Sequence, residues 1–533
     1  MPGGGLYALV AYGAQNVLLS GNPDFTYFYK TYKKYAHFAE ESVTFSMDGP
    51  QDLSYDQPIQ IRYKIQRIAD LIRDVYFLID LPDIYCKYIE LPQNGRTAQY
   101  NFAWVQYIGC HIIQNIGFFI GGQKIQEFDG SYMIAKAQAD LDSRSFQKWS
   151  RLVGNVPEVY DPANGLYGGG RTGKGYPLIY NNNGPGGPIL PANVNRPSIE
   201  GRTLQIPLSF WFTESTFESL PLVSLQYQEC EIQITLRPIN QLYRINDING
   251  NTVAPGYQYN PSPIIYQPEN VYYTSVSDIS DITINNFLTD IGTPKPLLNT
   301  WSLNPRIQMT YIYLTDEERT HFSSEPLQYL VRQLTSYEFP GLSIREIVEL
   351  RTHNPIERMI IMPRRSDSLL YRNQTANFTN WINPLKPPFI ATGIPPPGYP
   401  TPTQWPPNVN LISATGNFVL NGQRSIMRAL TVLGDGNQLQ EEKPLEYFTQ
   451  VVPWKYLTGI PDPELLVYPF GLQSPSTQPD GSINSSRIKL FQVDLNVNPL
   501  PVNSFYTYDI TIYVESLNWV SISSGTGGLK YAL

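Results

Sequence analysis

Apolar and polar residues alternate along several segments of this chain, and this pattern constrains its fold more than any other feature. Within 59–66, isoleucine and tyrosine occupy the odd positions, while glutamine, arginine and lysine occupy the even ones. Alternation of period two predicts half-buried antiparallel strands, with the apolar side against a core and the polar side toward water. The same pattern recurs over 75–81, 230–236 and 506–515. We therefore expect an all-β protein.

The composition agrees with many short strands joined by turns. The 533 residues include 46 prolines, 39 glycines and 38 tyrosines, and only 16% of them are charged. Proline and glycine favour turns, and tyrosine favours strands. At about 150 residues per domain the length allows three or four domains, but a β-sandwich of about 200–250 residues is common, so two large sandwiches fit equally well.

Helical signals are few. The segment 131–149 is the best candidate, because Met133, Ala137 and Leu141 are spaced by four. The sequence Thr-Asp-Glu-Glu at 315–318 fits a capping box that opens a short helix. Its three acids could be proposed as a metal site, but stabilisation of a helix N-terminus explains them better.

Three irregular stretches organise the chain. Segments 152–200 and 383–409 are dense in glycine or proline, and each is expected to be a loop excursion inside a strand-rich half. Segment 241–300 has few charges and is expected to connect the halves. The layout predicts an architectural duplication without an obvious sequence repeat. The expected parts are an N-terminal segment 1–27, a first sandwich 28–240, a connector 241–300 and a second sandwich 301–533.

Charge and cysteine usage bear on partners and compartment. The net charge of −8 argues against a nucleic-acid coat. The lysines at 30, 33 and 34 alternate with tyrosines; a solvated basic face is the simpler interpretation, and contact with anionic lipid or nucleic acid the sharper one. Three scattered cysteines and no cationic signal peptide predict unpaired buried thiols in a chain that is soluble and cytoplasmic when made. The cysteines are Cys86, Cys110 and Cys230.

The motifs of common enzymes are missing from the sequence. No two of the four histidines, His37, His111, His321 and His353, have the spacing of a zinc site. The run 168–175 (GGGRTGKG) has phosphate-loop spacing, but Gly175 stands where a serine or threonine would hold magnesium, and a flexible loop explains it better. A Ser–His–Asp set or a carboxylate pair assembled across the fold stays open at this point. We expect no catalytic residues, no metal site and no cofactor.

Three Asn-x-Ser/Thr sequons could accept glycans. The first two of them adjoin the second long loop, and a host pathway would not meet them without a signal peptide. They are Asn373, Asn377 and Asn484.

Several segments, in order along the whole chain, resemble one viral family. Together they resemble the major capsid proteins of large nucleocytoplasmic DNA viruses, the double jelly-roll lineage, and the differences lie mainly in the two long loops. The segments are 4–43, 201–239, 311–334 (which holds TDEE), 350–362 (LRTHNPIERMIIM), 420–429, 468–490 and 523–533 (SSGTGGLKYAL).

The resemblance implies two consecutive eight-stranded antiparallel jelly rolls with long loops and a few short helices. It further implies homotrimers of pseudo-hexagonal outline that tile an icosahedral shell in the virion. Residues 1–27 would lie on the inner capsid face, near minor capsid and penton proteins and an internal membrane. Direct nucleic-acid binding is not expected.

Two other classes of function are alternatives. A carbohydrate- or receptor-binding jelly-roll protein of the virion surface is the main alternative, because aromatic residues can stack on sugars. An enzyme on a β-sandwich is the other, and the motif census argues against it. A trimeric purified protein favours the capsid subunit, and a monomer that binds glycans tightly favours the first alternative.

Overall fold

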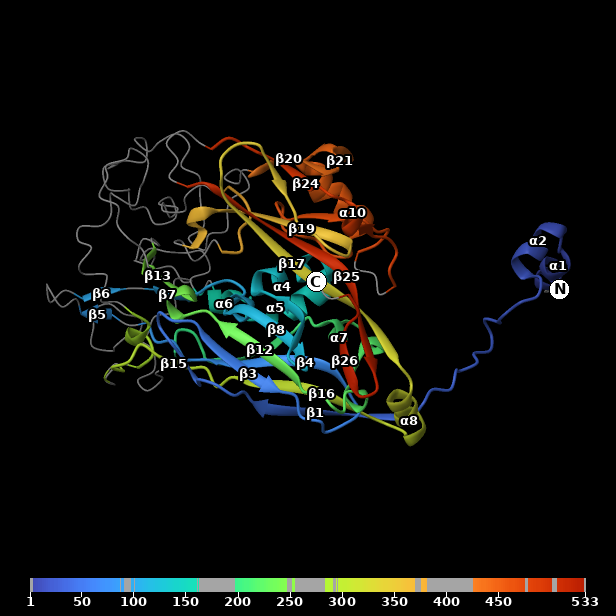
Figure 1. The fold of residues 1–533 in the computed structure, drawn as a ribbon, viewed down its shortest axis with the longest axis horizontal. Coiled ribbons are helices and arrows are strands. Elements are labelled where there is room, and N and C mark those ends of the chain that lie inside the picture. Colours follow the sequence, from blue (N-terminus) through green and yellow to red (C-terminus); the bar gives the residue numbers. More distant parts are fainter. Residues whose placement is uncertain are drawn as a thin grey trace.

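A computed structural model gives the fold (Figure 1). It describes residues 3–86, 88–90, 97–99, 101–160, 162, 197–246, 252–254, 283–290, 294, 296–369, 375–380, 425–474, 478–500 and 506–531.

The first sandwich packs two four-stranded antiparallel sheets face to face. One sheet has the order β1-β16-β4-β10, with the short β11 added to β4, and the other has the order β3-β12-β8-β9. Strict inside–outside alternation appears in β12, as the sequence predicts. The strands are β1 (Phe38–Ser46), β3 (Ile59–Lys64), β4 (Leu71–Leu81), β8 (Ile113–Ile120), β9 (Gln123–Phe128), β10 (Arg202–Pro207), β11 (Leu220–Pro221), β12 (Cys230–Leu236) and β16 (Arg306–Leu314).

The second sandwich repeats this plan. One sheet has the order β17-β25-β19-β22, with β23 and β26 attached, and the other has the order β18-β24-β20-β21. The strands are β17 (Leu327–Leu342), β18 (Glu346–Glu349), β19 (Pro355–Arg365), β20 (Met427–Gly434), β21 (Asn437–Pro444), β22 (Leu466–Pro469), β23 (Ile483–Asn484), β24 (Phe491–Val497), β25 (Tyr508–Ser523) and β26 (Thr526–Leu529).

Both sandwiches are jelly rolls with the same connectivity. When the eight principal strands of each are numbered along the chain, one sheet is ordered 1-8-3-6 and the other 2-7-4-5 in both sandwiches. This order is that of an eight-stranded jelly roll, in which two interleaved Greek keys limit exposed sheet edges. The predicted double jelly roll and architectural duplication are confirmed.

The predicted boundary between the sandwiches is wrong. β16 pairs with β1 along its whole length and with β4, so it is the eighth strand of the first sandwich rather than part of the second. Segment 241–300 is consequently an excursion within the first sandwich, and its β13 pairs with β7. The connection between the sandwiches is α8 (Asp316–Ser324) with its flanking residues.

The predicted long loops lie largely or wholly outside the described residues. Segment 383–409 falls between β19 and β20, the third and fourth strands of the second sandwich. Segment 152–200 falls between β9 and β10, and its described part includes α6 (Pro157–Tyr160). Smaller elements of the first half are β2 (Asp52–Leu53), β5 (Tyr88–Glu90), β6 (Thr97–Gln99), β7 (Asn101–Trp104), β13 (Tyr243–Asn246), β14 (Thr252–Ala254), β15 (Trp301–Ser302), α3 (Ile108–His111) and α7 (Trp211–Glu214).

The helix predicted over 131–149 is two helices. α4 (Gly130–Asp140) and α5 (Ser143–Leu152) are separated by Leu141, which has an extended backbone, and each helix is N-capped by an aspartate. Spacing by four continues across this break, which is why the sequence suggested one helix. The acids of 315–318 do open α8, but the Thr315 side chain makes no capping hydrogen bond, so the predicted capping box is not formed.

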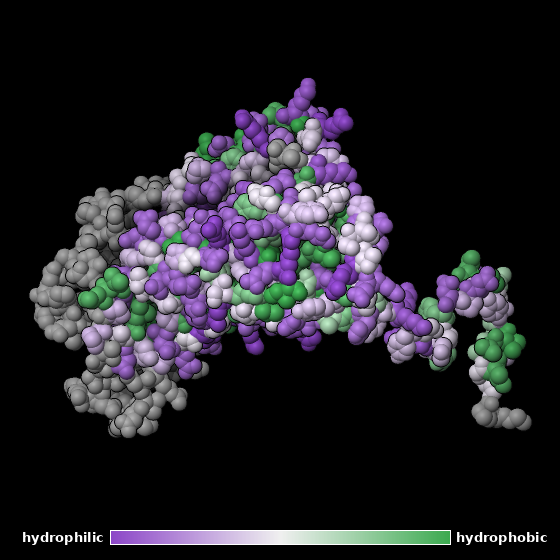
Figure 2. Space-filling view, turned by 60° about the horizontal axis from the view of Figure 1, so that its bottom comes forward, coloured by the Kyte–Doolittle hydropathy of each residue, from purple (hydrophilic) through white to green (hydrophobic). Residues whose placement is uncertain are grey.

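The N-terminal segment is an arm that stands away from the sandwiches (Figure 1). It contains α1 (Gly4–Val10) and α2 (Ala14–Ser20), and every described residue before β1 is exposed. Hydrophobic side chains gather on this arm, as Figure 2 shows, and Leu18 and Leu19 are each 90% exposed. The arm extends to residue 37, ten residues beyond the predicted boundary at 27, because the first strand begins only at Phe38.

Candidate functional site: the junction between the sandwiches

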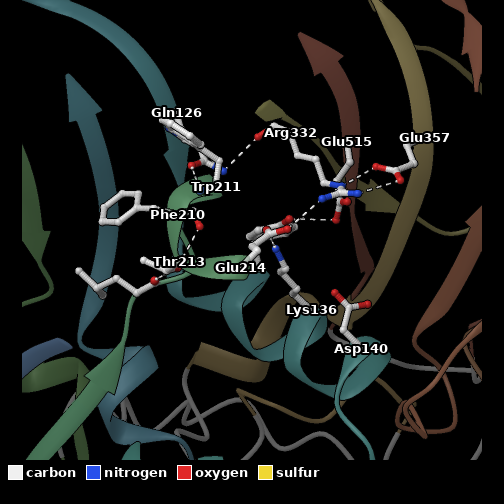
Figure 3. A network of polar contacts seen from close by, with 12 residues as sticks. Gln126, Lys136, Asp140, Phe210, Trp211, Thr213, Glu214, Arg332, Glu357 and Glu515 are labelled. Carbon is white, nitrogen blue, oxygen red and sulfur yellow. Dashed lines mark hydrogen bonds and ion pairs between the residues drawn. The ribbon is translucent and has the colours of Figure 1, made fainter. Parts of the chain in front are cut away.

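The two sandwiches are joined by a buried surface that continues the first core. Ile360 and Met362 of β19 and Tyr513 of β25 pack into the hydrophobic cluster of the first sandwich. They come from the outer face of the second sandwich's 1-8-3-6 sheet. α4, α7 and β9 of the first sandwich lie against this face, and a network of charged side chains crosses it (Figure 3).

Arg358 of β19 is the cation at the centre of this network. Its Nη1 and Nη2 donate to the two carboxylate oxygens of Asp140, the last residue of α4, at 2.5 and 2.9 Å. Its Nε lies 2.8 Å from Oε2 of Glu515, close enough for an ion pair although the two atoms are not aligned for a hydrogen bond. The Arg358 side chain is 2% exposed and that of Glu515 is 1% exposed. Arg358 therefore links helix α4 to two strands of the second sandwich.

A second set of ion pairs extends the network. Arg332 of β17 donates from Nε and Nη2 to the carboxylate of Glu357, at 2.6 and 3.1 Å. Its Nη1 donates to Glu214 of α7 at 2.9 Å, and Lys136 of α4 also pairs with Glu214. Figure 3 shows Lys136 and Arg332 approaching Glu214 from opposite sandwiches. Arg332 and Arg358 thus each have one carboxylate partner in the first sandwich and one in the second.

Neutral side chains complete the junction. The Tyr132 hydroxyl donates to Glu515 at 2.9 Å, and the Tyr513 hydroxyl donates to Asp129 at 2.8 Å. Gln126 of β9 donates to the backbone carbonyl of Arg332 and accepts from the backbone of Trp211. Because buried polar groups are costly when unpaired, these bonds fix the relative placement of the sandwiches.

The electrostatics agree with a paired, ionised network. Burial alone would raise the pKa of the Glu214 carboxyl, but Lys136 and Arg332 outweigh it and hold that pKa below its usual value. Burial opposes the charge of Arg358, yet Asp140 and Glu515 raise its pKa well above the usual value. Glu218, half-buried close by, is different: burial, followed by repulsion from Glu214, raises its pKa to about 7.

The geometry of this cluster suits structure rather than catalysis. Its cavity measures about 10 Å³, near the lower limit for a single water molecule. Four carboxylates line this cavity, and each is paired with a cation or a hydroxyl. They are those of Asp140, Glu214, Glu357 and Glu515. Within the described ranges, no group of histidine, cysteine, aspartate and glutamate side chains has the geometry to hold a metal ion. The arrangement can lock two sandwiches together, and it offers no substrate a place.

The residues that the sequence singled out lie elsewhere. Asn484 is exposed on β23, Asn377 is half-buried with its Oδ1 accepting from Thr379, and Asn373 lies outside the described residues. All three cysteines are buried and none of them forms a disulfide, as predicted. The run 168–175 also lies outside the described residues. Lys30, Lys33 and Lys34 are exposed on the N-terminal arm, and the four histidines lie on separate elements.

Sequence reasoning missed the network itself. Alternation placed Tyr513 and Glu515 on the water side of their strand, but both are almost fully buried. Their strand is covered on both faces, by its own core and by the first sandwich. The sequence does carry one signal for this covered face, in β19, the strand that pairs with β25. Its run of apolar residues shows no alternation, which is typical of a strand buried on both faces.

Two family models match nearly all of this fold. Residues 26–273 match the model described as "Major capsid protein N-terminus", and residues 318–528 match "Large eukaryotic DNA virus major capsid protein". β16, which completes the first sandwich, falls between the two matches.

Curated relatives and solved structures agree. The major capsid protein of Phaeocystis pouchetii virus is 25% identical, with 99% of each chain covered. That of Paramecium bursaria Chlorella virus 1 is 23% identical, again with 99% of each chain covered. The fold is similar to the PBCV-1 capsid subunit (TM-score 0.63, 18% identity, 95% of this chain and 100% of that one). It is also similar to the Faustovirus major capsid protein (TM-score 0.59, 14% identity, 97% and 96%).

These full-length matches are to capsid proteins, not to carbohydrate-binding proteins, and they accord with a double jelly roll whose conspicuous buried charges serve to hold its halves together. The chain belongs to the major capsid proteins of large eukaryotic DNA viruses, and it forms the icosahedral capsid of the virion.

Proposed function

We propose that this capsid subunit works as a closed homotrimer of pseudo-hexagonal outline, which then tiles against neighbouring trimers. The observation that supports this is the identical strand order of the two sandwiches in one chain. Three such chains around a threefold axis present six similar sandwiches, and one heterologous interface used three times closes the ring.

Solution mass tests the trimer directly. A chain of 60.5 kDa gives a trimer of about 180 kDa by light scattering after size exclusion. A monomer at every concentration would contradict the proposal. Electron micrographs of the same sample provide a second test, because pseudo-hexagonal particles are expected.

We propose that the N-terminal arm faces the capsid interior and docks there on minor capsid or penton proteins or on an internal membrane. Its exposed leucines and tyrosines support this, because large exposed apolar surface marks interaction sites. In the part of the chain that the structure describes, no helix is long and apolar enough to cross a bilayer.

Deletion of residues 1–27 tests the role of the arm. The truncated protein is expected to keep its trimeric mass, because the deleted part of the arm stands away from both sandwiches (Figure 1). It is expected to lose co-sedimentation with inner capsid components or anionic vesicles. Co-sedimentation equal to that of the full chain would contradict the proposed role.

The remaining expectations are also proposals. We propose a purely structural, non-enzymatic protein without a cofactor, made in the host cytoplasm and not bound directly to nucleic acid. The net charge of −8 supports the last point. Of the two sequon asparagines that the structure describes, Asn484 is the better placed for a glycan, since it is exposed, and a mass shift after glycosidase treatment of virions would reveal one.

A further inference from the structure

A helical segment follows the fifth strand in both sandwiches, but only one of the two is covered. In the first sandwich, α4 follows β9 and is buried in the junction along nearly its whole length. In the second, residues 445–456 follow β21 as the π-helical turn η9 (Tyr447–Val451) and α10 (Val452–Tyr456). Trp454 of α10 is 90% exposed and Val451 of η9 is 45% exposed. The second helical segment therefore carries apolar surface that this chain leaves in water.

The face that receives α4 also has an equivalent. α4 lies on the outer face of the second sandwich's 1-8-3-6 sheet. The part of that sheet compared below consists of β17, β25 and β19. The equivalent strands of the first sandwich are β1, β16 and β4. Their outer face lies on the side of the molecule away from the second sandwich (Figure 1), and its charged side chains are partly exposed, 35% for Glu40 and Arg73 and 25% for Asp74.

Strand register makes the two faces comparable residue by residue. The third strand of each sandwich has one extra residue against its eighth strand, Arg73 in β4 and Glu357 in β19. The residues that follow these bulges, Asp74 and Arg358, are therefore equivalent. Carrying the register across to the first strand makes Glu40 of β1 equivalent to Arg332 of β17.

Every charge of this set is reversed between the two faces. Arg332 pairs with Glu357 at 2.6 Å in the second sandwich, and Glu40 pairs with Arg73 at 2.9 Å in the first. The third member is a cation, Arg358, on one face and an anion, Asp74, on the other.

The helices that would dock show the same reversal. The residue of α4 that binds Arg358 is Asp140, at the helix end. The last turn of α10 carries Lys455 instead, which is exposed beside Trp454. Within the chain, the acid Asp140 of α4 thus pairs with the cation Arg358. The base Lys455 of α10 is available to pair with the anion Asp74, which is the equivalent of Arg358 on the other face.

We infer that the surface of Trp454 and Lys455 docks on the Glu40–Arg73–Asp74 face of a second copy of this chain, with Lys455 paired to Asp74. The inference rests on the proposed trimer, and it assigns the faces that close it. Each contact between copies repeats the geometry of the junction within one copy, so six sandwiches follow one another around the ring. The reversed charges keep the two contacts distinct, because Lys455 would repel Arg358 and Asp140 would repel Asp74.

Charge exchange tests the assignment. Light scattering over a dilution series gives the trimer dissociation constant of the wild type, of Lys455→Glu, of Asp74→Lys and of the double variant. Each single variant is expected to weaken the trimer at least tenfold, and the double variant to recover to within about threefold of the wild type, because opposite charges again face each other. Lys489→Glu is the matched control, since Lys489 is an exposed lysine of the same sandwich outside this surface.

The outcomes separate this inference from the proposed function. A monomeric wild type would overturn the trimer itself. A trimeric wild type whose single variants stay as tight as Lys489→Glu would overturn only the assigned faces.

Disulfide cross-linking gives a second readout that does not depend on charge. A chain carrying Lys455→Cys and Asp74→Cys is expected to form covalent dimers and trimers on oxidation, without background because the three native thiols are buried. Absence of cross-links in an intact trimer would overturn the assignment.

Discussion

Replacement of Arg358 by methionine tests whether the buried network holds the sandwiches together. The change keeps a long apolar side chain but leaves Asp140 and Glu515 without their shared cation, in surroundings where both carboxylates are less than one-tenth exposed. Removing one partner of a buried ion pair costs about 3–5 kcal/mol. Two carboxylates lose their partner here, so we expect the upper part of that range.

Calorimetry of the purified protein measures this effect. A domain of 150–250 residues loses about 2–4 °C of Tm per kcal/mol, so the upper part of the range, about 4–5 kcal/mol, corresponds to a loss of about 8–20 °C for the transition that includes the junction. Arg351→Met is the matched control, because Arg351 is 86% exposed and its ion pair with Glu349 should contribute less than about 1 kcal/mol.

A compensating variant separates lost charge balance from lost packing. Adding Asp140→Asn and Glu515→Gln to Arg358→Met removes the unpaired charges while keeping the side-chain sizes, so at least half of the lost Tm should return. If Arg358→Met melts within 2 °C of the control, or if the added changes lower its Tm further, the network does not stabilise the junction as argued.

Three other predictions follow from single sites. Burial raises the pKa of Glu464 to about 7, so the folded state keeps a proton that the unfolded state releases near pH 4.5. The contribution of this carboxyl to the free energy of unfolding should be complete below pH 4.5, and up to about 3 kcal/mol should be lost as the pH rises through 7. Urea titrations of Glu464→Gln should lack this loss. Gly459→Ala should loosen the junction, because a Cβ would collide with the backbone carbonyl of Gln138, and more rapid amide exchange in α4 is the expected sign. Gly5→Ala is the control, because a Cβ there would meet no neighbouring atom and the backbone needs no positive φ. Burial raises the pKa of Cys230 to about 12 and that of Cys110 further, so a thiol reagent should label native protein far more slowly than urea-unfolded protein; equal rates would contradict the buried placement.

Much of the fold could be predicted from the sequence because each half-buried strand records its own environment. The alternation in 59–65 and 230–236 places the same residues inward as the structure does. The resemblance of short segments then supplied the connectivity, which alternation alone does not encode.

The boundaries and the junction could not be predicted in this way. β16 alternates as well as any strand, but its pairing with β1 and β4 depends on partners far away in sequence. Glu515 follows the same alternation, and only the second sandwich's position against α4 turns its apparent water side into an interior. Local pattern reports which face of a strand is polar, and tertiary packing decides whether that face meets water.

The late position of β16 imposes a delay during synthesis. β1 is the first strand to leave the ribosome, and the roughly 260 residues between β1 and β16 take about 13–50 s to translate at 5–20 residues per second. Throughout that interval, β1 and β4 lack the strand that lies between them, and each presents an unpaired edge that can capture another nascent chain. Polysomes making this protein therefore carry many half-closed sandwiches close together, so a factor that shields strand edges should raise the yield of soluble subunits more than one that acts on the finished chain.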